Sequence, residues 1–227
     1  MIIGNGLIAS LFTENDQENI IFFASGVSNS LETKKEEFLR EENLIKKTIT
    51  ENPNKVFIYF STCSIYDSSK AESQYVLHKL KMEQIIIQLC PQYLILRLSN
   101  AVGNGGNPNL LMNYLVRSVK NKEIINVHTK ATRNLIDVED IKNITNQLID
   151  KQYFNKIINI AYPENYTIIE ILEIIEKFYQ TKLYLNLVKS GSGYGIDTHD
   201  VESYFIQHAL TNKETYLYKI LEKYYSN

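Results

Sequence analysis

The feature that most limits the fold is an alternation, in the first half of the chain, between short β-branched or aromatic runs and longer helical patterns. The expected strands are residues 1–3, 20–24, 56–61 and 93–98, and the expected helices are residues 6–12, 33–50 and 74–89. Residues 57–60 and 94–96 are continuously apolar, which is typical of parallel strands that helices cover on both faces. The alternation therefore predicts an α/β fold with a Rossmann-like parallel sheet, whose ligands bind beyond the carboxyl ends of the strands.

The second half of the chain departs from this alternation after a turn-rich stretch, Gly103–Asn109. Beyond it we expect a helix at Asn109–Lys120 with Pro108 at its start, strands at 134–138 and 156–161, helices at 138–150 and 167–178, and a Gly/Ser-rich loop at 190–195. We therefore expect a Rossmann-like core over residues 1–103, completed by the strand at 156–161. Residues 104–227 are expected to form mainly a small substrate-binding lobe, and the whole chain one compact structural unit.

A glycine turn follows the first expected strand. Gly4-Asn5-Gly6-Leu7-Ile8-Ala9 lies between that strand and the first expected helix. In this position a glycine-rich turn lets the backbone approach a pyrophosphate and directs helix N–H groups toward it. The alternative interpretation is a tight turn that binds nothing, since Ala9 stands in place of a third glycine.

The connection after the first helix is short. The chain passes from the helix expected at 6–12 to the strand expected at 20–24, which leaves no room for two further strands and their crossovers. In a dinucleotide-binding sheet those strands help to hold adenosine. We therefore expect a shortened sheet in which the adenosine end of a cofactor is held differently or weakly.

Composition narrows the classes of partner and the compartment. The formal net charge of −2 provides no basic field for a phosphate backbone, so no nucleic-acid partner is expected. Cys63 and Cys90 are too few for a disulfide framework and lack partners at metal-ligand spacing, so we expect no metal and a reducing, cytoplasmic setting. Met1 leads directly into Ile2 and Ile3, and no apolar run approaches the ~20 residues that span a bilayer, so neither secretion nor a membrane partner is expected.

Tyr75 and Lys79 stand at positions i and i+4 of the helix expected at 74–89, one turn apart on one face. A lysine in that position favours the phenolate form of a tyrosine, which could then exchange a proton with a substrate hydroxyl or carbonyl. The spacing alone carries little weight. A chain with 16 tyrosines is expected to contain about one such match by chance, and Tyr66/Lys70 is a second.

The setting separates the two pairs. Tyr66 and Lys70 are joined by loop-forming residues, so their side chains need not converge. Tyr75 and Lys79 lie in a helix without Gly or Pro, and Ser61-Thr62-Cys63-Ser64 places hydroxyls at the carboxyl end of the preceding strand. The alternative for Tyr75 and Lys79 is a surface pair beside a Ser/Thr-rich strand end.

With these segments the chain resembles the extended short-chain dehydrogenase/reductase family, specifically the NAD-dependent epimerase/dehydratase group that acts on nucleotide sugars. Residues 57–66 resemble that family's apolar strand with its Ser/Thr motif, and Tyr75 and Lys79 match its Tyr-x-x-x-Lys. Gly6-Leu7-Ile8-Ala9 resembles the second half of its glycine turn. The other matching segments are Ala24–Ser28 beneath the cofactor, Asn43 in the following helix, Leu96–Gly103, Arg133–Asp140 and Asn159–Ala161.

The resemblance implies roles for particular residues. Thr62, Tyr75 and Lys79 would be catalytic. NAD or NADP, with an atypical adenosine end, would be held by Gly4, Gly6, Leu7, Ile8, Ala24, Ser25, Gly26, Ser61, Tyr75 and Lys79. A nucleotide-sugar substrate would contact Ser64, Asn100 and Arg133, and no metal is implied. The alternatives are a surface salt bridge for Arg133 and a turn-capping role for Asn100.

The resemblance also favours some reactions over others. Cys63 and Ser64 stand where the family's dehydratases carry an Asp-Glu pair, which argues against dehydration. The expected function is therefore an NAD(P)-dependent oxidoreductase or epimerase that reduces or epimerises a nucleotide-linked keto sugar. The alternative is a non-catalytic module that binds a nucleotide sugar or a partner. By family analogy, the helices at 33–50 and 74–89 could pair with their copies in a homodimer.

Overall fold

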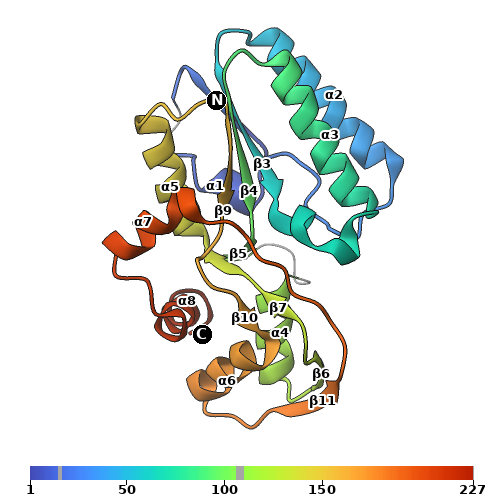
Figure 1. Ribbon diagram of the computed structural model, residues 1–227, viewed down its shortest axis with the longest axis vertical. Helices are drawn as coiled ribbons and strands as arrows, with labels where there is room; N and C mark the ends of the chain where they lie inside the picture. Colours follow the sequence, from blue (N-terminus) through green and yellow to red (C-terminus); the bar gives the residue numbers. More distant parts are fainter. Residues whose placement is uncertain (15–16, 106–109, 227) are drawn as a thin grey trace. The chain divides into compact units, whose positions relative to one another are not determined.

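The structure is a computed structural model that describes residues 1–14, 17–105 and 110–226 (Figure 1). These residues form two compact units. The first contains Met1–Leu98 and Glu139–Ile160, and the second contains Ser99–Val138 and the chain from Ala161 onward. The expected helix start at Pro108 and Asn109 lies outside the described residues.

The first unit is a parallel sheet covered by helices on both faces, so the predicted α/β, Rossmann-like class is confirmed. Its strand order is β1-β2-β3-β4-β9, with bounds Ile2–Ile3, Ile20–Phe23, Val56–Thr62, Tyr93–Leu98 and Lys156–Ile160. Helices α2 (Lys35–Glu51) and α3 (Gln74–Leu89) lie side by side on one face, and α1 (Leu7–Ser10) and α5 (Val138–Asp150) lie on the other (Figure 1).

Apolar packing on both faces explains the continuous apolar runs in β2 and β3. On the face covered by α2 and α3, Phe23 and Tyr59 pack with buried side chains of both helices. On the opposite face, Phe12 stacks on Phe22 and on Phe60, with ring centroids 4.3 and 5.6 Å apart. Burying a large apolar side chain contributes about 1.5–3 kcal/mol, so these two layers stabilise the sheet that carries the site.

The sheet is shortened at its amino-terminal edge, as predicted. β1 is an edge strand that pairs only with β2, with Ile2 opposite Phe22. In the part of the chain that the structure describes, no strand lies between α1 and β2. Gly4 has φ +125° at the end of β1, and a Cβ there would lie 2.4 Å from the carbonyl oxygen of Ala24. The turn therefore requires glycine at this position.

In its described residues, the second unit combines three short strand pairs with four helices. The pairs are β5 (Asn100–Val102) with β8 (Leu135–Asp137), β6 (Ile124–His128) with β11 (Tyr184–Val188), and β7 (Thr132–Arg133) with β10 (Tyr166–Thr167). The helices are α4 (Leu111–Lys120), α6 (Ile168–Tyr179), α7 (His199–Gln207) and α8 (Lys213–Tyr225). The rings of Tyr162 and Tyr216 stack at 4.3 Å, and Phe205 meets Tyr162 edge-on at 5.3 Å, which anchors α7 and α8.

Several elements of this unit differ from the sequence expectation. The unexpected elements are β5, β6, β7, β10, β11 and α7. In the first unit, α2 begins at Lys35 rather than at residue 33. β11 is exposed along most of its length, so its residues lack the alternation that identifies a half-buried strand. Its pairing with β6, about 60 residues away in the sequence, is a tertiary contact that a local pattern does not encode.

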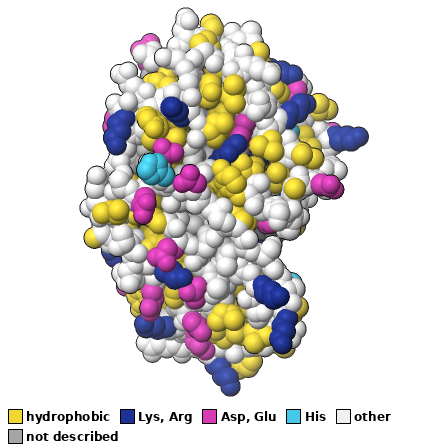
Figure 2. All heavy atoms as spheres, in the orientation of Figure 1, with side chains coloured by type: hydrophobic (Ala, Val, Ile, Leu, Met, Phe, Trp, Pro, Cys, Tyr) yellow, Lys and Arg dark blue, Asp and Glu magenta, His cyan; other side chains and the backbone are white. Residues whose placement is uncertain are grey.

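The surface carries charges of both signs. On the face shown in Figure 2, Lys and Arg side chains are interspersed with Asp and Glu, without a continuous basic area. Every helix among the described residues is too short or too polar to cross a lipid bilayer.

Candidate active site

Thr62, Tyr75 and Lys79 all belong to the first unit, near the carboxyl end of β3. Thr62 is the last residue of β3, and its Oγ1 accepts a hydrogen bond from the Ser64 amide at 3.0 Å. Tyr75 and Lys79 lie on successive turns of α3. Tyr75 packs against Val27 of the loop after β2, and no hydrogen bond engages its hydroxyl among the described residues. Within the described part of the chain, the Tyr75 hydroxyl is therefore free to form a hydrogen bond with a ligand.

The ammonium of Lys79 is buried and fully hydrogen-bonded. It donates to Glu41 Oε1 at 3.2 Å, to the Tyr59 hydroxyl at 3.0 Å and to the Phe60 carbonyl at 3.4 Å. An ammonium has three donors, so these acceptors satisfy it completely. Both Tyr59 and Phe60 belong to β3, and the bonds therefore fix Lys79 against the strand that leads to Thr62.

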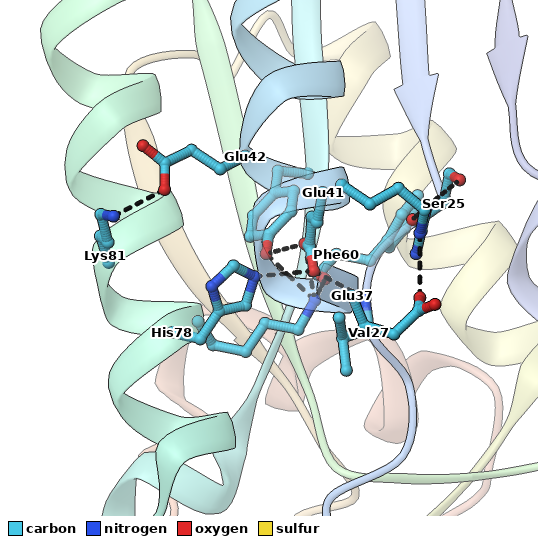
Figure 3. Close-up of polar contacts among 11 residues, drawn as sticks. Ser25, Val27, Glu37, Glu41, Glu42, Phe60, His78 and Lys81 are labelled. Carbon is cyan, nitrogen blue, oxygen red and sulfur yellow. Dashed lines mark hydrogen bonds and ion pairs between the residues drawn. The ribbon is translucent and has the colours of Figure 1, made fainter. Parts of the chain in front are cut away.

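Glu41 lies on α2, where it faces His78 of α3 (Figure 3) and pairs with Lys79 of the same helix. Its Oε1 also accepts from the Tyr59 hydroxyl at 2.6 Å, and its Oε2 contacts the Val27 amide at 2.6 Å and His78 Nε2 at 3.0 Å. Burial alone would raise the pKa of Glu41, but the Lys79 charge and these hydrogen bonds outweigh it and lower the pKa to about 2. Glu41 is therefore an ionised, buried carboxylate.

The loop after β2, predicted to lie beneath a cofactor, is tied to the same network. The Val27 amide donates to Glu41, and a Cβ on Gly26 would lie 2.5 Å from Lys79 Nζ. The Ser25 carbonyl and Oγ accept from Arg40 Nη1 at 3.2 and 3.3 Å, and the Ala24 amide donates to the Ile3 carbonyl at 2.8 Å.

A second buried network lies between α3, β3 and β4, on the same face of the sheet as Tyr59. Ser61 Oγ donates to Glu83 Oε1 at 2.5 Å, and Arg97 holds both oxygens of Glu83 at 3.0 and 2.6 Å. Arg97 also donates to the Tyr66 hydroxyl, which donates to Asn159 Oδ1 at 2.9 Å. Burial opposes the Arg97 charge, but the bonds to Glu83 and Tyr66 raise its pKa. The Ser61 and Tyr66 hydroxyls are thus both engaged in binding neighbouring side chains.

The glycine turn before α1 leaves space on its outer side. Gly6 caps α1 without a side-chain hydrogen bond, and a Cβ built on it meets nothing within 4 Å. Leu7 and Ile8 are half-buried in the first turn of this four-residue helix. The turn therefore has room for a ligand group close to its backbone.

The remaining predicted substrate residues divide between the units. Ser64, in the first unit, is half-buried in the 3-10 helix Cys63–Tyr66 that follows Thr62. Asn100 and Arg133 belong to the second unit. Asn100 Nδ2 donates to the Asn134 carbonyl at 2.7 Å, and Arg133 Nη1 donates to the Thr132 carbonyl at 2.7 Å. Each side chain therefore has a structural contact within its own unit.

Residues 4–161 match the model of the NAD dependent epimerase/dehydratase family. The chain belongs to this family. The match runs from the glycine turn through β9 and so covers the whole of the Tyr75 and Lys79 region. The predicted family resemblance is confirmed.

Solved structures of family enzymes share the fold. UDP-glucuronic acid 4-epimerase from Bacillus cereus, in complex with UDP-glucuronic acid and NAD, has a TM-score of 0.68 at 16% identity, over 95% of this chain and 79% of that one. UDP-N-acetylglucosamine 4-epimerase from Methanobrevibacter ruminantium M1 has a TM-score of 0.69 at 15% identity, over 92% and 79%. The dTDP-glucose 4,6-dehydratase from Bacillus anthracis, in complex with NAD, has a TM-score of 0.69 at 16% identity, over 97% and 76%. No curated protein matches the chain.

The sequence alone did not identify Glu41, the residue that pairs with Lys79. Asn43 was matched to the family's helix asparagine, but Asn43 is exposed and Glu41 faces Lys79. A signal was present: Glu41, Ile45 and Thr48 are spaced i, i+4 and i+7, which is the buried face of α2. An acidic residue on an apolar helical face indicates a buried partner.

Proposed function

We propose that the protein is an NAD(P)-dependent enzyme that reduces or epimerises a nucleotide-linked keto sugar. The observation that carries this proposal is the placement of Tyr75 one helical turn from the ion-paired Lys79, with its hydroxyl unengaged by any group that the structure describes. A phenol so placed can give a proton to a sugar oxygen or take one from it.

The pyrophosphate of a dinucleotide fits the described glycine turn. Gly4 and Gly6 bring backbone to the carboxyl end of β1, and the space beside Gly6 admits a phosphate group. The adenosine end fits less well. β1 is the edge strand, and the described residues provide no further strand beside it against which adenosine could bind. When bound, the cofactor supplies hydride transfer at a sugar carbon.

Each catalytic residue has a distinct task in this proposal. Tyr75 holds or moves the proton at the sugar oxygen, and Thr62 at the end of β3 donates a hydrogen bond to that same oxygen. Lys79, whose three donors are all used, holds α3 against β3 beside Tyr75. Contact between Lys79 and a cofactor ribose would require exchange of one bond, and the 3.4 Å bond to the Phe60 carbonyl is the longest.

Reduction or epimerisation is favoured over dehydration by the state of Cys63. Its side chain is buried, and its Sγ donates to the Arg97 carbonyl at 3.0 Å. Burial raises the pKa of Cys63 to about 12, so the thiol cannot exchange protons readily near neutral pH. Cys63 therefore cannot replace the acid of the Asp-Glu pair that family dehydratases carry.

The nucleotide sugar is the substrate class of the solved relatives, and we carry it to this chain as part of the proposal. Ser64, Asn100 and Arg133 are the residues we assign to it, with the guanidinium of Arg133 directed to a phosphate. The second unit would then be mainly the substrate-binding lobe. Identification of any nucleotide that co-purifies with the protein would define the nucleotide half.

Cofactor binding is the first test of the proposal. Titration with NADH and NADPH, followed by the fluorescence of the reduced nicotinamide, is expected to saturate for at least one of them in the wild type. Gly6→Leu, which fills the space beside the turn, is expected to weaken binding without loss of fold. If neither nucleotide binds at millimolar concentration, the enzymatic proposal fails.

A non-catalytic binding module is the second candidate, and the full occupation of the Lys79 donors is the observation that favours it. Tyr75→Phe discriminates between the two. An enzyme loses activity in this variant, whereas a binding module complements a strain lacking the protein as well as wild type does.

A homodimer through α2 and α3 is a further part of the proposal. These adjacent helices expose Leu39 and Leu77, which are 56% and 53% accessible. Pairing with a second copy would cover them. Light scattering is expected to give twice the chain mass, and a monomer mass would exclude the dimer.

A further inference from the structure

Glu41 is a point where four parts of the first unit meet. Its carboxylate contacts the Val27 amide after β2, the Tyr59 hydroxyl of β3, and His78 and Lys79 of α3. Figure 3 shows Val27 of the loop and His78 of the facing helix beside the Glu41 side chain. Glu41 is fully buried, so no water competes for these contacts.

The donor count requires a carboxylate at this position. Oε1 accepts from Tyr59 and Lys79, and Oε2 accepts from the Val27 amide, which can only donate. A glutamine would place its own NH₂ against either Val27 or Lys79, and one buried donor would lose its acceptor. Because both oxygens face obligatory donors, the isosteric amide cannot replace Glu41.

Gly26, in the loop after β2, packs directly against the Glu41–Lys79 ion pair. A Cβ on this residue would lie 2.5 Å from Lys79 Nζ and 2.8 Å from Glu41 Oε1, so the glycine backbone packs directly on both charged groups. The hydrogen bond from Val27 to Glu41 holds the loop in that position. The Glu41 carboxylate therefore fixes both the position of the Lys79 ammonium and the backbone conformation of residues 26–27.

We propose that Glu41 is a positioning residue of the site: it holds the Lys79 ammonium beneath Gly26 and anchors the Gly26–Val27 backbone on which Tyr75 packs. Only the expected effect of Glu41 on cofactor binding rests on the proposed function. The positioning itself is a property of the chain alone, and it is tested without any ligand.

The ligand-free test measures the accessibility of individual lysines by reductive methylation and mass spectrometry. Lys47, with 69% of its side chain exposed, is the internal reference. In the folded wild type, Lys79 is expected to react at least about tenfold more slowly than Lys47. Glu41→Gln is expected to raise the relative rate at Lys79 by about tenfold, since the ammonium loses its countercharge and its fixed place.

Two carboxylates serve as matched controls. Glu42, adjacent on α2, pairs with Lys46 and Lys81 at 2.7 and 2.6 Å, so Glu42→Gln removes the same charge without touching Lys79. Glu83 is buried on α3 and pairs with Arg97, so Glu83→Gln tests the loss of a buried carboxylate elsewhere. Both variants are expected to leave Lys79 protected. Equal exposure of Lys79 in Glu83→Gln would show a general loosening and overturn the inference.

Glu41→Asp covers the case in which Glu41→Gln does not fold. It keeps the charge but shortens the side chain, and it is expected to give an intermediate rate at Lys79. Wild-type protection in folded Glu41→Asp would contradict the inference, because the shortened carboxylate cannot hold all four groups.

The consequence for cofactor binding is measured separately, by NADH titration of the same variants. Glu41→Gln is expected to weaken NADH binding about tenfold and Glu42→Gln to leave it unchanged. If the wild type does not bind NADH, the proposed function fails while the labelling still decides the role of Glu41. If Lys79 stays protected in Glu41→Gln, the inference about Glu41 fails whatever NADH does.

Discussion

Lys79 Nζ lies 3.2 Å from Glu41 Oε1, and both side chains are buried beneath Gly26. A charge pair of this kind gains little over apolar packing while intact, but removal of one partner leaves an uncompensated buried charge. The lysine that the family resemblance predicts to be catalytic is therefore also a structural member of the α2–α3 interface.

Replacement of Lys79 is expected to cost stability as well as activity. Lys79→Met leaves the Glu41 carboxylate without its cation, and we expect a loss of about 3–5 kcal/mol in the free energy of unfolding measured with urea. Lys81→Met, which removes an exposed partner of Glu42, is expected to change it by less than about 1 kcal/mol. Equal losses in the two variants would contradict the buried pair.

The double variant Lys79→Met with Glu41→Gln separates the charge effect from packing. Because it removes both charges, its loss of stability is expected to be smaller than the sum of the two single losses. Additive losses would show that Lys79 and Glu41 do not interact.

Acid is expected to destabilise the fold through Glu41. Its pKa is about 2 in the folded protein against an ordinary value of 4.5 for a glutamate, so the unfolded state binds the proton more readily. The contribution is therefore present above pH 4.5 and is lost as the pH falls toward 2, by roughly 3 kcal/mol in total. Urea midpoints between pH 6 and pH 2 are expected to fall less steeply in Glu41→Gln than in Glu42→Gln, which retains the buried carboxylate.

Gly26→Ala is expected to disturb the site directly. The added methyl would meet Lys79 Nζ at 2.5 Å and Glu41 Oε1 at 2.8 Å, so the pair or the loop must shift, at a cost of about 1–3 kcal/mol. Gly195→Ala has nothing within 4 Å of its Cβ and is the matched control. Thermal unfolding compares the stability of the two variants. An unchanged unfolding midpoint for Gly26→Ala would mean that the loop accommodates the methyl group without loss of stability.

The extent to which sequence predicted this structure differs between the sheet and the site. β3 and α3 follow from local patterns, because a continuous apolar run and a helix without Gly or Pro leave few alternatives. The Glu41 contact does not: its spacing with Ile45 and Thr48 places Glu41 on the buried face of α2, but only the packing of α2 against α3 brings it to Lys79, 38 residues away. β11 was not predicted for a related reason, because the strand pairs with β6, which is distant in the sequence.

The shortened sheet leads to a prediction about the two halves of the cofactor. β1 is the edge strand, so adenosine has no neighbouring strand to bind against among the described residues, while the turn at Gly4 and Gly6 remains. Reduced nicotinamide mononucleotide is therefore expected to bind within about tenfold of NADH, a difference of about 1.4 kcal/mol. Fluorescence titration of both compounds measures this ratio, and AMP is expected not to compete with either. A preference for NADH of a thousandfold or so would mean that other parts of the protein hold adenosine, since about 4 kcal/mol of binding free energy would then have to come from that half of the cofactor.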